Sequence, residues 1–185
     1  MKKEVVIFIS GKGTNAINII EYSKKTESFE VSHIFSNNIN FQKEKINNLN
    51  VKYFLFKNDE LEFEVLKELK KIDPQLIILA GFLKKIPKSF ITYFKKRIIN
   101  IHPSLLPKYG GVGMYGSAVH ESVIKNKEIF TGITIHYVSE QYDEGKIIFQ
   151  KSISINQYDD AEKIEKKIHK LEYKYYPKII ESLLN

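Results

Sequence analysis

The sequence alternates short apolar runs, rich in isoleucine, valine and phenylalanine, with longer stretches whose apolar residues recur at helical spacing. This alternation constrains the fold strongly, because parallel strands need a crossover connection, usually a helix, between one strand and the next. Strands are predicted over five runs: Glu4–Ile9, Phe29–Phe35, Val51–Phe56, Leu76–Ala80 and Arg97–His102. The fourth run is apolar throughout, as expected of a central parallel strand that is covered on both faces.

Helices are predicted over the intervening stretches: Thr14–Lys25, about Asn40–Leu49, Leu61–Ile72, Pro87 to about Phe94, and Ser117–Lys125. Two later β-rich stretches, Thr131–Val138 and Lys146–Ile155, have a short separator, which favours an antiparallel C-terminal part of the sheet. A terminal helix follows Asp159 and Asp160, and we expect Pro177 to kink or restart it. The sequence therefore predicts an α/β fold with a mostly parallel, Rossmann-like sheet and helices on both faces.

Length and composition predict a single domain over residues 1–185. Of the 185 residues 43% are hydrophobic, which is enough for one core and too little for two ordinary domains. The chain contains no cysteine, which excludes disulfides and thiolate nucleophiles and fits a reducing, cytoplasmic location. No apolar run reaches the roughly 18 residues of a membrane-spanning helix, so no membrane partner is expected.

The net charge of +7 comes from 29 lysines and arginines against 22 acidic residues, yet Arg97 is the only arginine. Proteins that read nucleic acids favour arginine for bidentate contacts, and the lysines here are spread along the predicted helices. The charge therefore argues against a nucleic-acid partner and suits anionic small molecules.

Two polar side chains stand at the end of the fifth predicted strand. Asn100 and His102 point to the same side, because side chains alternate along a strand with a period of two, and Pro103 ends the strand. In open α/β sheets the carboxyl ends of the strands are where ligands bind. His102 is interpreted either as a hydrogen-bonded structural histidine or as a catalytic group, and its place beside Asn100 leaves both interpretations open.

The loop Ser10–Asn15 lies between the first predicted strand and the first helix. Its two glycines allow a tight turn, and the free amides of a helix N-terminus make an anion site, which favours a single phosphate. Gly13 is expected to leave room for that anion. The alternative is a tight turn in which Thr14 or Asn15 caps the helix. No acidic residue follows the second strand to hold a ribose diol, so a dinucleotide is disfavoured.

Further candidates occur in the C-terminal third. Asp143 lies in a turn, where an aspartate with no role beyond the turn is the alternative to a functional one. Thr134 and His136 share one face of a predicted strand, and they either line a cleft or only decorate it.

Five motifs, in order, carry a family resemblance: SGKGTN after the first strand, AGFL at 80–83, NIHPSLLP from Asn100, GITIH at 132–136 and YDEG at 142–145. Together they resemble the folate-dependent formyltransferase family, in the branch that acts on glycinamide ribonucleotide. The resemblance extends over nearly the whole chain. It implies transfer of the formyl group of 10-formyltetrahydrofolate to the amine of glycinamide ribonucleotide in purine synthesis, with no metal.

The resemblance also implies roles for individual residues. The catalytic residues implied are Asn100, His102 and Asp143, and Asp143 is expected to hold the tautomer of His102 and favour its charged form. Those implied for the ribonucleotide are Gly13, Thr14, Asn15, Pro103 and Glu172. Those implied for the folate are Leu83, Lys84, Lys85, Ile86 and Asn100. A monomer or weak homodimer is expected.

The sequence departs from the family pattern at two places. Asn58–Glu62 lacks an arginine that often contacts the folate, so Lys84 or Lys85 is the candidate to replace it. Gly110–Gly116 is glycine-rich, and is interpreted either as a mobile lid or as a flexible insertion.

Several other functions stay open as alternatives. Methionyl-tRNA formyltransferase and formyltetrahydrofolate hydrolase share the formyl-transfer core, but each normally carries a further domain that we do not expect within 185 residues. Sugar-nucleotide formyltransferases share the same core. The remaining alternative is a folate- or nucleotide-binding module without catalysis.

Overall fold

The computed structural model describes residues 1–39, 41 and 49–185, which form one seven-stranded sheet. The strands are β1 (Lys3–Ile9), β2 (Phe29–Ser36), β3 (Lys52–Leu55), β4 (Leu76–Leu79), β5 (Ile98–His102), β6 (Phe130–Tyr137) and β7 (Ile147–Ser154). Their order in the sheet is β3-β2-β1-β4-β5-β6-β7. The first five strands are parallel, whereas β6 runs antiparallel to both β5 and β7. This confirms the predicted fold class, including its antiparallel C-terminal part.

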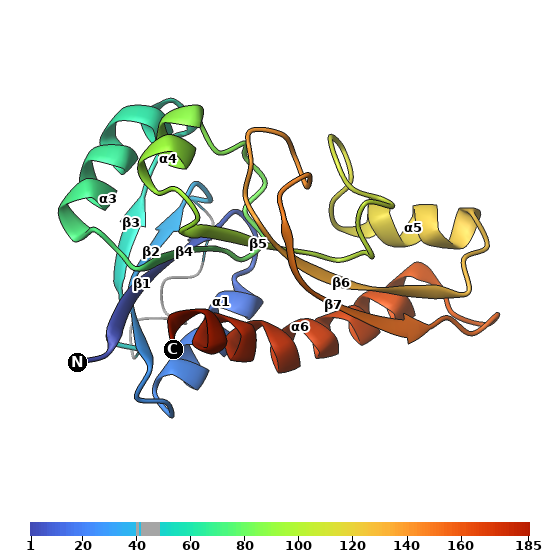
Figure 1. The fold of residues 1–185 in the computed structure, drawn as a ribbon. Coiled ribbons are helices and arrows are strands. Elements are labelled where there is room, and N and C mark those ends of the chain that lie inside the picture. The colour runs from blue at the N-terminus through green and yellow to red at the C-terminus, as the bar shows by residue number, and fades with distance from the viewer. Residues whose placement is uncertain (40, 42–48) are drawn as a thin grey trace.

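The helices cover both faces of the sheet. They are α1 (Thr14–Ser23), α3 (Leu66–Ile72), α4 (Lys88–Tyr93), α5 (Ser117–Lys125) and α6 (Ala161–Leu184), with a 3₁₀ turn at Asn58–Glu60 and a π-helical turn at Leu61–Val65 before α3. Figure 1 shows α3 and α4 on one face, and α1 and α6 on the opposite face. Alternating residues of the central strands β1, β2, β4 and β5 therefore enter two separate cores.

The two cores can be followed along β1. Val5, Ile7 and Ile9 pack beneath α1 and α6, and Val6 and Phe8 pack beneath α3 and α4. All five side chains are fully buried. A strand covered on both faces needs this unbroken apolar sequence, which is why β1 and β4 could be predicted from composition alone.

The predicted boundaries agree with the structure to within about two residues, with three exceptions. The stretch Leu61–Ile72, predicted as one α-helix, begins with the π-helical turn and becomes α-helical at Leu66. The helix predicted at about Asn40–Leu49 lies largely outside the described residues. The restart predicted at Pro177 does not occur, because α6 continues through that residue.

The continuity of α6 through Pro177 has a local explanation. Proline has no N–H, so the carbonyl of Tyr173, four residues earlier, loses its helical donor. The side-chain amide of Asn18 on α1 donates to that carbonyl at 3.0 Å. The helix is therefore stabilised from outside at the turn that proline weakens.

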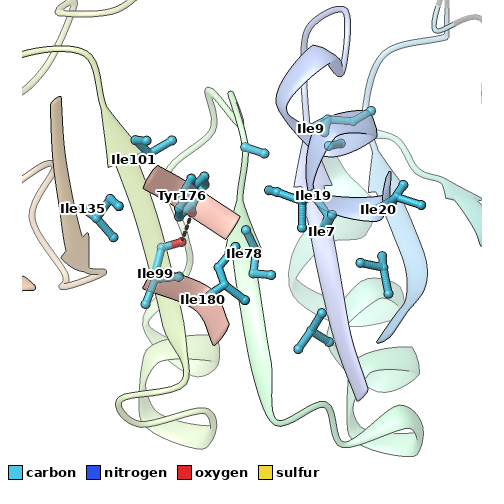
Figure 2. Close-up of a cluster of buried hydrophobic side chains, with 14 of the residues drawn as sticks. Ile7, Ile9, Ile19, Ile20, Ile78, Ile99, Ile101, Ile135, Tyr176 and Ile180 are labelled. Carbon is cyan, nitrogen blue, oxygen red and sulfur yellow. Dashed lines mark hydrogen bonds between the residues drawn. The ribbon is translucent and has the colours of Figure 1, made fainter. Parts of the chain in front are cut away.

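Tyr176 anchors α6 to the middle of the sheet. Its ring is fully buried, and Figure 2 shows it beside isoleucines of β4, β5 and β6. Its hydroxyl donates to the carbonyl of Leu79 at 2.9 Å, and the carbonyl of Ile99 lies 3.5 Å away. A buried tyrosine needs such acceptors, and here they fix α6 near the ends of β4 and β5. Glu172, one helical turn earlier, is thereby placed beside the functional site.

Candidate active site

A cavity of about 470 Å³ opens where the parallel strands β1, β4 and β5 end. Its wall is built from segments far apart in the sequence, among them Gly11–Asn15, Leu79–Ile86, Asn100–Pro103, Gly111–Gly116 and part of α6. The strand order reverses between β1 and β4, and their helices leave on opposite faces of the sheet (Figure 1). Such a reversal leaves a crevice at the carboxyl ends of the strands. The cavity thus lies where the sequence analysis expected a ligand.

Asn100 and His102 lie on the same side of β5 and both line the cavity, as the strand period predicts. β5 ends at His102, and Pro103 lines the cavity directly after it. The register of β5 against β6 places Asn100 opposite His136. Nδ2 of Asn100 and Nε2 of His136 are 3.2 Å apart. The strand pairing therefore adds a second histidine to the predicted cluster.

Asp143, from the loop between β6 and β7, lies between the two histidines. Its Oδ2 is 3.4 Å from Nδ1 of His102, and its Oδ1 is 3.5 Å from Nε2 of His136. Oδ2 also accepts the backbone N–H of Gly111 at 2.9 Å. Burial raises the pKa of Asp143, but the contacts with His136, His102 and the Gly111 amide outweigh it and lower the pKa below its usual value. The carboxylate is therefore ionised at neutral pH.

Both ring nitrogens of His102 face protein oxygens, Nε2 that of a backbone carbonyl and Nδ1 that of Asp143. Nε2 lies 2.7 Å from the carbonyl of Tyr109, and because a carbonyl only accepts, Nε2 carries a proton. Burial lowers the pKa of His102, whereas Asp143 and the Tyr109 carbonyl raise it by less. The attraction of Asp143 thus favours the charged ring, but loss of solvation outweighs it, so the pKa of His102 in the free protein lies below its usual value.

Gly110 lets the loop approach Asp143. A Cβ atom on Gly110 would lie 2.5 Å from Cδ2 of Leu106 and 3.1 Å from Cβ of Asp143. Asp143 itself has a left-handed backbone with φ 57°. The sequence analysis interpreted Gly110–Gly116 only as a lid or an insertion, and it missed that Gly110 and Gly111 pack against the acidic residue.

The loop before α1 presents a helix N-terminus to the cavity. The residue that caps α1 is Gly13, with φ 72°, and no side chain makes the cap hydrogen bond. The alternative in which Thr14 or Asn15 caps the helix is therefore wrong. A Cβ atom on Gly13 would lie 2.7 Å from the Phe41 ring and 3.4 Å from Ile9, so core packing and the left-handed backbone both favour glycine at this position.

Asn15 and Glu172 join α1 to α6 at the cavity wall. Nδ2 of Asn15 donates to Oε2 of Glu172 at 2.8 Å, and the same oxygen lies 2.8 Å from Nδ1 of His169. The hydrogen bond that the His169 ring donates to the Glu172 carboxylate is the largest cause of a raised pKa at His169. Oδ1 of Asn15 is buried and has no hydrogen-bond partner among the described residues.

The sequence analysis missed His169 and Glu165, which line the cavity beside Glu172. Nε2 of His169 lies 3.5 Å from Glu165. The sequence spacing could have identified them, because residues 165 and 169 are four apart and residues 169 and 172 are three apart, which places all three on one face of a helix.

The segment Leu83–Ile86 forms another part of the wall. Ile86 is buried in the core beneath α3 and α4, whereas Leu83 is 47% exposed. Lys84 and Lys85 are exposed. The backbone N–H of Leu83 donates to Oγ of Ser10 at 3.0 Å, which joins this segment to the loop before α1.

The sequence alone left open whether Thr134 and His136 line a cleft or only decorate it. The structure gives the two residues different positions. His136 lines the cavity. Thr134 is fully buried, donates to the carbonyl of Ser104 at 2.6 Å and accepts the N–H of Leu106 at 3.0 Å, so it supports the loop after β5. His120, on α5, also lines the cavity and was missed.

Within residues 1–39, 41 and 49–185, no three His, Cys, Asp or Glu side chains are arranged to hold a metal ion. None of the helices in this part of the chain is both long enough and apolar enough to cross a membrane.

Comparison with known proteins gives a consistent result. The formyl transferase family model matches residues 3–180. A phosphoribosylglycinamide formyltransferase of Bacillus subtilis is 36% identical, with 98% of this chain and 95% of that protein covered. A chloroplastic protein of the same name from Vigna unguiculata is 35% identical over 98% of this chain, which spans 61% of the plant protein.

A solved structure agrees with these sequence matches. Phosphoribosylglycinamide formyltransferase from Bacillus halodurans superposes with a TM-score of 0.90 at 32% identity, and the match covers 99% of this chain and 96% of that one. The family model, the sequence relatives and the fold all indicate that the chain belongs to the formyl transferase family.

Proposed function

We propose that this chain transfers the formyl group of 10-formyltetrahydrofolate to the amine of glycinamide ribonucleotide, giving formylglycinamide ribonucleotide in purine biosynthesis. The observation that supports this most strongly is the cluster of Asn100, His102 and Asp143 at the end of β5. The cluster lines a cavity that also contains the N-terminus of α1 at Gly13 and a partly apolar wall at Leu83–Ile86. The cavity thus offers separate surfaces to an anionic and to an apolar reactant.

The N-terminus of α1 suits the phosphate of the ribonucleotide. Backbone amides in the first turn of a helix and the helix dipole both favour an anion. The carboxylate of Glu172, which Asn15 holds at the cavity wall, suits the hydroxyl donors of a ribose. We therefore assign Gly13, Thr14, Asn15, Pro103 and Glu172 to the ribonucleotide.

The Leu83–Ile86 segment suits the folate. Leu83 offers an apolar surface to its ring system, and Ile86 anchors this segment in the core behind it. The exposed Lys84 and Lys85 suit the carboxylates of its glutamate tail. Bound there, the cosubstrate supplies the activated formyl group. We assign Leu83, Lys84, Lys85, Ile86 and Asn100 to it.

The catalytic groups have complementary tasks. Nδ2 of Asn100 has two hydrogens, and His136 takes only one of them, which leaves the second to donate to the oxygen that becomes negative when the amine attacks. Nδ1 of neutral His102 has a free lone pair, because its proton is on Nε2. Nδ1 accepts the proton of the attacking amine and returns it to the departing folate nitrogen. Asp143 stabilises the charged ring in between.

One assay tests this function against its alternatives. The protein is mixed with 10-formyltetrahydrofolate, with and without glycinamide ribonucleotide, and both tetrahydrofolate and formylated product are measured. We expect the two products in equal amounts and only with the ribonucleotide present. Release of tetrahydrofolate without an acceptor would indicate a hydrolase. Transfer only to a sugar nucleotide or to methionyl-tRNA would indicate another branch of the formyltransferase family. Folate binding without turnover would indicate a binding module without catalysis.

We also propose a single domain, a state of monomer or weak homodimer, and a cytoplasmic location. The sheet and its cores run without division from β1 to α6, which supports one formyltransferase domain over residues 1–185. A state of monomer or weak homodimer is tested by sedimentation velocity over a range of concentrations. The cytoplasmic location, with no nucleic-acid or membrane partner, is tested by cell fractionation.

A further inference from the structure

His102 depends on a backbone atom of a loop. Its Nε2–H donates to the carbonyl of Tyr109 at 2.7 Å, and this is the shortest contact that the ring makes with the protein. A carbonyl can hold an imidazole in place only if its own peptide is fixed. Tyr109 directly precedes Gly110 and Gly111, and its backbone is left-handed, with φ 57°. Tyrosine rarely adopts this conformation, so surrounding contacts must stabilise it.

The contact that does so comes from outside the cavity. The hydroxyl of Tyr109 donates to Oε1 of Glu128 at 2.9 Å, in the connection between α5 and β6. Lys108 donates to the same oxygen at 2.8 Å. Lys108 is the residue before Tyr109, and its carbonyl accepts a hydrogen bond from the buried hydroxyl of Ser104 at 2.6 Å. Glu128 therefore holds the hydroxyl of Tyr109 at the last position before the glycines, and Asn126 makes a second side-chain hydrogen bond with the tyrosine.

We propose that Tyr109 and Glu128 form a tether that positions His102 for catalysis, although neither residue lines the cavity. Glu128 holds the tyrosine hydroxyl, the tyrosine holds its own peptide, and the carbonyl of that peptide holds Nε2–H of His102. This fixes the ring orientation and keeps Nδ1 directed at Asp143. Both residues are positioning residues, since they act only through His102.

The tether has an electrostatic consequence of known sign. The groups that act on His102 are Asp143, His136 and Glu172, besides the Tyr109 carbonyl. Burial lowers the pKa of His102, while the Tyr109 carbonyl raises it. If the tether is broken, the carbonyl moves away and the pKa of His102 falls further. A loss of stability elsewhere in the protein would not produce this change.

Four variants separate the tether from its surroundings. Tyr109→Phe removes the hydroxyl and keeps the ring that packs against the core. Glu128→Ala removes the acceptor, whereas Glu128→Gln keeps an acceptor oxygen at nearly the same place. Lys108→Met removes the other, exposed partner of Glu128 and leaves the tyrosine contact intact.

The first measurement is the titration of the His102 ring by NMR in the free protein, which does not depend on the proposed function. We expect a lower pKa in Tyr109→Phe and Glu128→Ala, and a pKa near the wild-type value in Glu128→Gln and Lys108→Met. An unchanged His102 pKa in the first two variants would overturn the proposal. Equal shifts in all four would also do so, because they would indicate a general effect of surface charge.

The second measurement, which rests on the proposed function, is the formyl-transfer rate. Tyr109→Phe and Glu128→Ala should each lower kcat by about three- to tenfold, the effect of one lost hydrogen bond, with little change in KM. The double variant should be no slower than either single one, because both remove the same contact. Multiplicative losses would overturn the tether. If the wild type does not transfer formyl, only the proposed function fails, and the NMR titration still decides the tether.

Discussion

The two ends of the cavity differ in how firmly their side chains are held. At the β5 end, Asn100, His102 and Asp143 each contact another protein group, and His102 is only 4% exposed. At the Leu83–Ile86 end, the two lysines are exposed and Leu83 is about half exposed. Preorganised groups suit a reaction whose geometry must be fixed, and exposed ones suit a flexible, charged tail. Substitutions at the first end should therefore change kcat, and substitutions at the second should change binding.

The largest effect is expected for Asp143→Asn. The substitution removes the charge that contacts both His102 and His136, so kcat should fall by about 10²-fold or more, while KM changes much less. Steady-state kinetics with both substrates checks this. Glu144→Gln, an exposed neighbour in the same loop, is the matched control and should keep the wild-type rate. A large rise in KM with unchanged kcat would contradict the assigned role.

The same carboxylate predicts a pH dependence of stability. The pKa of Asp143 is lower in the folded protein than its usual value, so its contribution to stability is present above the usual pKa. That contribution is lost as the pH falls through the lowered folded value. Wild type and Asp143→Asn should therefore differ in unfolding free energy at neutral pH and converge in acid, as denaturant titrations would show.

A smaller loss of kcat is expected for Gly110→Ala. The added methyl group would lie 2.5 Å from Leu106 and 3.1 Å from Asp143, so the loop must move and displace the carboxylate. A displacement of this kind should lower kcat by about ten- to a hundredfold, with ribonucleotide binding little changed. Kinetics and ribonucleotide titration check this. Wild-type kcat would mean that the close approach of Gly110 does not place Asp143.

An effect on binding is expected for Glu172→Gln. It weakens the junction with Asn15, so KM for glycinamide ribonucleotide should rise by about five- to tenfold with a smaller change in kcat. The pKa of His169 should fall, because the hydrogen bond to Glu172 is the largest cause of its raised value. Glu162→Gln, in an exposed ion pair with Lys166 on the same helix, should change neither. A constant His169 pKa would contradict the interaction.

The smallest effect is expected at Lys84 and Lys85. If one of them meets the glutamate tail, its substitution by glutamine should weaken binding of polyglutamylated folate by about two- to fivefold more than that of monoglutamate. High salt should reduce the difference, since the lysines are exposed. Equal effects on both folates, measured by fluorescence titration, would reject the assignment and remove the contrast between the two ends.

The fold could be predicted because its signals are local. Unbroken apolar runs and helical stripes identify β1, β4, β5 and α5 nearly to the residue. What the sequence could not show depends on contacts between distant segments. Pro177 is one case, since the carbonyl of Tyr173 that it leaves without a helical donor is satisfied by Asn18 of a distant helix.

The candidate site could be predicted in part for the same reason. Asn100 and His102 follow from one strand and the proline after it. The place of His136 depends on the register between β5 and β6, and the lowered pKa of His102 depends on burial by the whole fold. The contact of Gly110 with Asp143 joins two loops whose spacing in the sequence carries no signal.

The central claim is that His102 and Asp143 act as one catalytic unit at the end of β5. The most direct test is the kcat of His102→Ala, Asp143→Asn and the double variant with saturating 10-formyltetrahydrofolate and glycinamide ribonucleotide. Because residues that act as a unit are not additive, the double variant should be about as slow as the slower single one. Losses that multiply, or a silent Asp143→Asn, would show that His102 works without this carboxylate and would contradict the account.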